Sequence, residues 1–318
     1  MRISTPLAIP TLLAVLLPAV LLPAAAATAA EPVAPRHLLA EYTTRANITY
    51  SVAGGSELKL DVYRPRVPGA PRPTLVFVHG GGWVAGAKED AVLWLIPWLQ
   101  AGWSAVNVEY RLARVAHAPA AVEDVRCALR WVFRNAEEHA FDTRRIVVSG
   151  DSAGGHLALA MAMLPDSLGL DRGCTVRFPA GTNSWASLPA WTVTPAAVVN
   201  WYGITDVAEM LAGEGGRGYA VEWLGSQRER EAVARSLSPV THARSGVPPV
   251  ITIHGDADTV VPYTHGVRLH DALTRAGVAN RLVTIKGGAH GRFTPAEMDA
   301  AYGAMREFLL THIGTAGP

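Results

Sequence analysis

One serine sits in a short turn whose neighbours suggest a chemical role for it. Ser152 is the middle residue of the run GDSAG at positions 150–154, a G-x-S-x-G pattern. The apolar run 146–149 before it predicts a strand buried on both faces, and the Ala- and Leu-rich run 156–161 after it predicts a buried helix. Joining the two so sharply strains the middle residue, requires neighbours without a Cβ atom and lifts the serine hydroxyl clear of the backbone. The pattern indicates a nucleophile that attacks a carbonyl carbon rather than an idle serine in a tight turn.

Three glycines after another apolar run could stabilise the charge that such an attack creates. The run 74–78 predicts a second buried strand, and it ends in HGGGW at positions 79–83. Consecutive glycines let backbone N–H groups point into a cavity, where they can hold the negatively charged oxygen of a tetrahedral intermediate. We expect the amides of Gly81, Gly82 and Ala153 to be these donors, and the loss of one typically raises the barrier by about 3–4 kcal/mol. The alternative is a glycine-rich surface turn.

A serine hydroxyl is a poor nucleophile near neutral pH, so it needs a base, and the base needs an acid that fixes its tautomer. His290 follows the predicted strand 281–285, and the small residues around it (GGAHG) leave its imidazole room to reach the serine. Asp256 and Asp258 follow the predicted strand 249–253, and either could supply the acid.

The other apolar runs predict the elements that would carry these residues. Two alternating runs, 48–52 and 58–63, are joined by AGGS and predict a hairpin near the start. Further strands are expected at 103–110 and 197–201, and helices at 120–135, 267–276 and 296–311. Two long irregular segments, 164–194 and 206–245, lie between these elements, and long loops over a rigid sheet usually cover or line a site. A disordered surface insertion is the alternative for the first of them.

Several of these motifs together resemble those of an α/β-hydrolase carboxylesterase. They are HGGGW at 79–83, VNVEYRL at 106–112, the predicted helix 121–134 and SGDSAGGH at 149–156. More narrowly, the sequence is similar to the HGGG-type group that contains the hormone-sensitive-lipase-like esterases and, closer still, the secreted feruloyl and acetyl-xylan esterase-like proteins. The resemblance runs from about Asn47 to Ile313. It implies an α/β-hydrolase fold, with a mostly parallel central sheet and helices on both faces, in which Glu109 and Arg111 brace the glycine loop.

The resemblance also implies a triad whose members follow the order Ser, Asp, His along the chain. The family pattern of an acid, two residues and then Val-Pro matches Asp258 and leaves Asp256 as a turn residue. We therefore expect Ser152, Asp258 and His290 to be the catalytic residues of a serine hydrolase. Its substrates would be short-chain carboxylic esters of small molecules or saccharides, cleaved through an acyl-enzyme.

Four tryptophans are candidates for contacts with such a substrate. Trp83 adjoins the oxyanion glycines, and Trp185, Trp191 and Trp223 lie in the two long segments. Flat rings near the mouth of the site would suit an aromatic or sugar leaving group better than a long flexible chain. The alternative is that these rings only pack the loops. About fifty residues of the expected mature chain precede HGGG, so we expect no large N-terminal cap over the site.

The first thirty residues predict export from the cell. The stretch 1–30 has one positive charge, at Arg2, then an apolar run broken by prolines and small residues that offer A-x-A-like cleavage. This is the pattern of a cleaved secretory signal peptide, which leaves residues 31–318 as a single extracellular catalytic domain. In a secreted chain the two cysteines, Cys127 and Cys174, suggest a disulfide, although Cys127 could equally be a small buried hydrophobic residue.

Composition and spacing argue against other classes of protein. The 28 Lys and Arg residues nearly balance the 27 Asp and Glu residues, so we expect no nucleic-acid partner and no stable membrane association. No His and acid cluster has metal-ligand spacing and no G-x-G-x-x-G run opens a βαβ unit, so we expect neither a metal nor a cofactor. Two alternatives stay open: an amidase or arylformamidase, and a non-catalytic binding protein on a hydrolase scaffold.

Overall fold

The computed structural model describes residues 1, 38, 40–177, 185–187, 192–212, 217–315 and 317–318. Apart from Met1, the predicted signal peptide lies outside the described residues, and so does Trp191. Residues 33–318 form one unit of the chain.

Within the described residues, eight strands form a sheet in the order β1-β2-β4-β3-β5-β8-β9-β10. β1 (Tyr42–Ala53) and β2 (Ser56–Pro65) form the predicted antiparallel hairpin, and β2 pairs antiparallel with β4 (Ser104–Val108). From β4 onwards neighbouring strands are parallel. They are β3 (Arg72–Val78), β5 (Phe141–Asp151), β8 (Ala197–Trp201), β9 (Val250–Gly255) and β10 (Asn280–Ile285). The expected mostly parallel sheet is confirmed.

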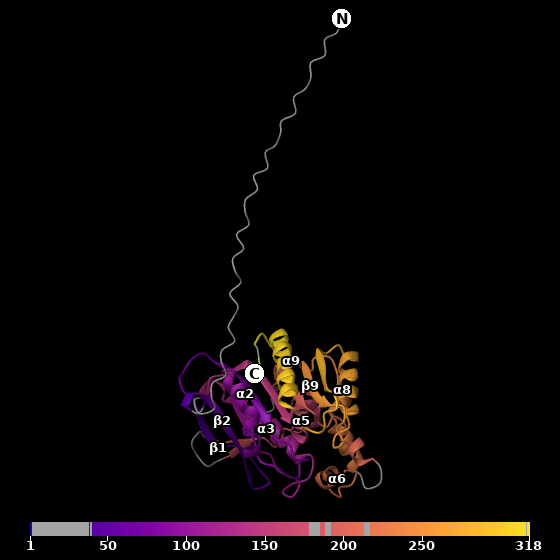
Figure 1. Cartoon of the computed structure of the whole chain (residues 1–318). Coiled ribbons are helices and arrows are strands. Elements are labelled where there is room, and N and C mark those ends of the chain that lie inside the picture. The colour runs from indigo at the N-terminus through magenta and orange to yellow at the C-terminus, as the bar shows by residue number, and fades with distance from the viewer. Residues whose placement is uncertain (2–37, 39, 178–184, 188–191, 213–216, 316) are drawn as a thin grey trace. The chain divides into compact units, whose positions relative to one another are not determined.

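Helices cover both faces of this sheet (Figure 1). α2 (Val92–Gln100) and α9 (Pro295–Ile313) pack on one face. α3 (Ala120–Arg134), α5 (Ala153–Met163) and α8 (Thr264–Arg275) pack on the other. Because both faces are covered, the buried parts of two central strands, residues 75–78 of β3 and 146–148 of β5, are continuous apolar runs rather than alternating ones. The remaining helices are α4 (Ala136–His139), α6 (Gly218–Leu224), α7 (Arg230–Ser236) and the short 3₁₀ helices η1 (Lys88–Ala91), η2 (Asp166–Leu168), η3 (Glu209–Leu211) and η4 (Pro239–His242).

Two helices differ from the expectation. α5 begins at Ala153, directly after the serine, so the nucleophile turn contains no residues between strand and helix other than Ser152. α2 was not predicted at all. Its sequence, VLWLIPWLQ, is apolar throughout and contains Pro97, so it shows neither a helical period nor a polar face.

The first long segment is tied to the rest of the fold at two points. A disulfide joins Cys127 of α3 to Cys174, which confirms the predicted bridge and rules out Cys127 as a free thiol. The next residues form β6 (Thr175–Arg177), which pairs with β7 (Trp185–Ser187) in a two-stranded ribbon. The Thr175 hydroxyl accepts a 2.9 Å hydrogen bond from the backbone N–H of Val52, so this ribbon lies against β1 at the edge of the sheet.

Candidate active site

The turn after β5 forces its serine into a strained backbone conformation. Ser152 has φ 54° and ψ −118°, in the region that favours glycine. Its backbone N–H donates to the carbonyl of Trp201 at 2.9 Å. A Cβ atom on Gly150 or Gly154 would come within 2.5 Å of the Val78 carbonyl oxygen, which explains why both flanking positions are glycine. The serine therefore stands at the carboxyl end of β5, beside the end of β3.

The structure brings together a serine, a histidine and an aspartate from three different loops. Oγ of Ser152 is 2.9 Å from Nε2 of His290, and Nδ1 of His290 is 2.6 Å from Oδ2 of Asp258. Oδ1 of Asp258 accepts the backbone N–H groups of Val260 and Val261 at 2.8 and 2.9 Å. Burial acts to raise the pKa of the Asp258 carboxyl, but its hydrogen bonds outweigh this effect and hold the pKa well below its usual range. The carboxylate is thus ionised and fixed beside the imidazole.

The second aspartate of this loop has a different position. Oδ1 of Asp256 accepts the backbone N–H of Gly287 at 2.5 Å, which joins the loop after β9 to the loop that carries His290. The structure therefore places the Asp258 carboxylate against His290, whereas the Asp256 carboxylate binds the backbone of the neighbouring loop.

The glycine loop turns sharply through two residues with left-handed backbone. Gly81 and Gly82 have φ values of 105° and 61°, and the Gly81 carbonyl accepts the N–H groups of Val84 and Ala85. Within the described part of the chain, the N–H groups of Gly81, Gly82 and Ala153 donate no hydrogen bond. Ala153 is the first residue of α5, where helix N–H groups lack intrahelical partners.

Side chains from neighbouring elements hold this loop in place. The hydroxyl of Tyr110 donates to the carbonyl oxygens of His79 and Gly80, both at 3.2 Å. Asp151 accepts the N–H of Gly80 at 2.9 Å. Glu109 accepts the backbone N–H of Lys88 at 2.8 Å, just beyond the loop.

Arg111 is bound to helix α3. Its guanidinium forms two-pronged contacts with the buried carboxylate of Asp124 on α3. Glu109 therefore contacts the backbone just beyond the glycine loop, whereas Arg111 contacts α3, so bracing of the loop by Arg111 stays a prediction.

Two of the four candidate tryptophans are buried, so for them the expected contact with a substrate is wrong and the alternative, that the rings pack the loops, holds. Trp83 and Trp223 are both 0% exposed and stack with their ring centroids 4.2 Å apart. Nε1 of Trp83 donates to Nδ1 of His156 at 3.2 Å. The described part of the second long segment, 206–212 and 217–245, contains helices, and its helix α6 packs over the glycine loop through Tyr219. Each indole therefore finds an apolar partner, and the pair stiffens the loop rather than contacting a ligand.

The other two candidates are not part of the described surroundings of Ser152. The backbone of Trp185 lies in β7, within the ribbon attached to β1, and β1 is four strands away from β5 in the sheet. Trp191 lies outside the described residues.

Three aromatic residues near the site were not identified from the sequence. Trp94 of α2 is partly exposed and lines a cavity of about 250 Å³ with the glycine loop, Asp90 and Asp151. Tyr219 of α6 packs over Gly82, where an added Cβ atom would lie 2.9 Å from the Cβ of the tyrosine. The ring of Tyr202 lies edge-on to His290, 4.7 Å away. The sequence signal for Tyr202 is its place directly after a predicted strand, whereas Trp94 and Tyr219 become neighbours of the site only through folding.

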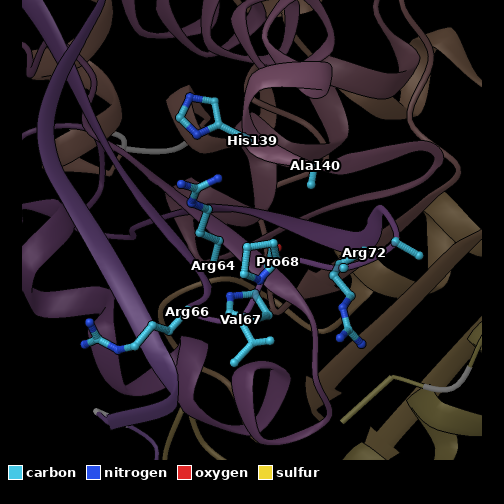
Figure 2. Close-up of a pocket in the computed structure, with 11 residues that line it drawn as sticks. Arg64, Arg66, Val67, Pro68, Arg72, His139 and Ala140 are labelled. Atoms are coloured by element: carbon cyan, nitrogen blue, oxygen red, sulfur yellow. The ribbon is translucent and has the colours of Figure 1, made fainter.

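Another hollow lies at the opposite end of the sheet, away from Ser152. It is lined by the connection between β2 and β3 and by residues beside the amino end of β5. Figure 2 shows the guanidinium of Arg64 turned toward His139, whereas Arg66 and Arg72 point away on either side. Their positive charges therefore do not converge on one point.

Among the described residues, no group of three or more His, Cys, Asp and Glu side chains could hold a metal ion. In the same part of the chain, every helix is too short or too polar to cross a bilayer.

Comparison with known proteins identifies the family of the chain. Esterase LipC of Mycobacterium tuberculosis is 32% identical over 248 residues, which are 73% of this chain and 56% of LipC. Carboxylesterase NlhH of the same organism is 37% identical over 143 residues, 42% of each chain. The chain therefore spans about half the length of the curated relatives that it matches.

Solved structures match over more of the chain. A truncated carbohydrate esterase from gut microbiota has a TM-score of 0.68 at 25% identity, covering 86% of this chain and 97% of the other. Esterase 2 of Thermogutta terrifontis has a TM-score of 0.67 at 28% identity, covering 86% and 94%. These matches confirm the α/β-hydrolase fold and the resemblance to HGGG-type esterases. The family described as BD-FAE matches residues 60–273, and the chain belongs to this family.

Proposed function

We propose that this protein is a serine hydrolase that cleaves short-chain carboxylic esters. The observation that carries the proposal is the continuous chain of hydrogen bonds from Ser152 through His290 to Asp258. Ala153 directly follows Ser152, and its N–H, with those of Gly81 and Gly82, would hold the oxyanion. The curated relatives and solved neighbours are named as esterases.

In the proposed reaction, Oγ of Ser152 attacks the ester carbonyl carbon while its proton passes to Nε2 of His290. The carbonyl oxygen becomes an oxyanion, which the N–H groups of Gly81, Gly82 and Ala153 hold. The C–O bond to the alcohol then breaks, and the leaving oxygen takes the proton back from His290.

A second attack completes the cycle. Water gives a proton to Nε2 of His290 and adds to the acyl-enzyme, and collapse of the new tetrahedral intermediate releases the acid and restores the Ser152 hydroxyl. Through both halves Asp258 accepts the Nδ1–H of His290, keeps the correct tautomer and stabilises the imidazolium.

Short acyl groups fit the surroundings of Ser152 better than long ones. The glycine loop is closed on one side by the buried Trp83–Trp223 stack and packed beneath Tyr219, so it leaves no groove there. The cavity beside the glycine loop, which Trp94 and Asp151 line but Ser152 does not, has a volume of about 250 Å³ and is small compared with common ligand pockets of roughly 300–1,000 Å³. One solved form of Thermogutta terrifontis esterase 2 contains propionate, and another neighbour is a carbohydrate esterase, which supports small acyl groups and saccharide alcohols here.

A panel of p-nitrophenyl esters from acetate to palmitate tests the proposal. We expect kcat/KM to be highest between acetate and butyrate and to fall toward decanoate and longer chains. Acetylated or feruloylated sugars should be hydrolysed as well. An optimum at ten carbons or beyond would require a long acyl groove and would contradict the short-pocket argument. Comparing an ester with its matching anilide separates an esterase from an amidase, because amide cleavage also requires protonation of the leaving nitrogen.

We further propose that the protein is exported and that its first thirty residues are removed. The N-terminal sequence pattern supports this, and so does the disulfide between Cys127 and Cys174, because disulfides persist in oxidising compartments. N-terminal sequencing of the protein from culture medium should find a start near Ala30 or Glu31. Intact protein retained in the cells would contradict the proposal.

A further inference from the structure

A second histidine contacts the acid of the candidate triad. His254 lies on β9, four residues before Asp258, and its side chain is 0% exposed. Its Nε2 atom is 3.2 Å from Oδ2 of Asp258 and 3.0 Å from the carbonyl oxygen of Val261. The same Oδ2 atom is 2.6 Å from Nδ1 of His290. Two imidazoles therefore meet on one carboxylate oxygen.

The direction of the hydrogen bond from His254 follows from its second partner. The Val261 carbonyl oxygen can only accept, so Nε2 of His254 carries a hydrogen and donates it. The other nitrogen, Nδ1, is buried and has no hydrogen-bond partner within the described residues. A Cβ atom on Gly266 of α8 would lie 3.3 Å from it, so the helix packs directly against the ring. Packing thus fixes an imidazole whose single donor points at the acid and its loop.

We propose that His254 is a positioning residue for the reaction assigned above, an inference that rests on the proposed function. Its N–H holds the carboxylate of Asp258 in the orientation in which Oδ2 accepts the Nδ1–H of His290. Because it shares Oδ2, it also limits how strongly Asp258 stabilises the imidazolium form of His290.

Other groups that face the two histidines do not supply a competing positive charge. They are Ser152, Asp151 and Tyr202 around His290, and Tyr263 and His265 around His254. Burial lowers the pKa of His265 to about 4, so this histidine is neutral at the pH of the reaction. Removing the donor of His254 should therefore act on the Asp258–His290 pair.

Two substitutions of equal length separate the hydrogen bond from the packing of the ring. Both His254→Met and His254→Gln fill the site with an unbranched side chain, but only glutamine keeps an N–H donor near the position of Nε2. We expect His254→Met to lower kcat for p-nitrophenyl acetate by about 10- to 100-fold with little change in KM. The acid limb of its kcat/KM profile should move to higher pH. His254→Gln should restore both quantities toward the wild-type values.

Equal kcat values and equal acid limbs in the two variants would overturn the proposal, whether both resemble the wild type or both are impaired. A wild-type protein without esterase activity would instead overturn the proposed function, so the two failures are distinguishable. Nitrogen-15 NMR of wild-type protein labelled at histidine gives a second readout if the methionine variant does not fold. The proposal requires a hydrogen on Nε2 of His254, and a tautomer with hydrogen on Nδ1 alone would overturn it.

Discussion

At the scale of single residues, two aspartates two positions apart differ in what their oxygens contact. Asp258 accepts hydrogen bonds from Nδ1–H of His290 and from two backbone N–H groups, whereas Asp256 accepts one from the backbone N–H of Gly287. Sequence spacing alone left both open, because either could reach a histidine on the next loop. Only the family pattern favoured Asp258, and the geometry of the loop places that residue against His290.

The two aspartates should respond differently to the same substitution. Asp258→Asn should lower kcat by about 10⁴-fold, because an amide can donate to Nδ1 and so stabilise the wrong tautomer of His290. Asp256→Asn should stay within about tenfold of wild type, because the amide oxygen can still accept from Gly287. Steady-state assays with p-nitrophenyl acetate measure both, and the reverse ranking would make Asp256 the acid.

At the scale of elements, the sequence identified the parts whose chemistry is local and missed those that depend on distant contacts. The turn at Ser152 and the glycine loop were recognisable because a strand, a glycine run and a helix start are adjacent in the chain. The role of Trp223 was not, because its partner Trp83 is 140 positions earlier and nothing local indicates that the two rings stack. Helix α2 was missed because its uniformly apolar sequence carries no period.

The stacked tryptophans should contribute to both stability and activity. Trp223→Ala leaves a cavity against Trp83 and should lower the free energy of unfolding by about 3–5 kcal/mol. It should also lower kcat, because Trp83 directly follows the oxyanion glycines. Trp94→Ala is the matched control, since Trp94 is partly exposed and should lose less stability while changing KM more. Urea denaturation followed by circular dichroism, together with steady-state kinetics, compares the two variants. Equal losses of stability would contradict a stabilising role of the Trp83–Trp223 stack.

At the scale of the whole molecule, the order of the eight sheet strands and of helices α3, α5, α8 and α9 along the chain was predictable from the apolar runs and the family resemblance, which covers almost all of the described chain. The burial of polar groups was not, since it depends on how all layers close together. His156, His265 and His270 lie on helices and are all buried, and burial lowers the pKa of each to about 4. For His156 the neutral form also agrees with its contacts, because Nδ1 accepts from Trp83 while Nε2 contacts the Leu237 carbonyl.

These histidines should make the fold sensitive to mild acid. Their folded pKa values lie below the unfolded value of about 6.5, so between pH 6.5 and 4 the unfolded chain binds protons that the folded chain does not. Stability should therefore fall as the pH falls through this window, by up to about 1.4 kcal/mol per pH unit for each histidine. Urea denaturation at pH 6.5, 5.5 and 4.5 measures the slope, and His270→Gln should reduce it by about one proton. A slope of zero would contradict the burial of neutral histidines.

The central claim is that the Ser152 hydroxyl is the nucleophile, and the rate of Ser152→Ala on p-nitrophenyl acetate tests it most directly. The variant should fold and melt at or above the wild-type temperature, because alanine removes the hydroxyl but keeps the packing of the turn. Its kcat should fall by about 10⁴-fold or more, as is typical for the loss of a triad member. A folded Ser152→Ala protein that hydrolyses the ester at close to the wild-type rate would contradict the account.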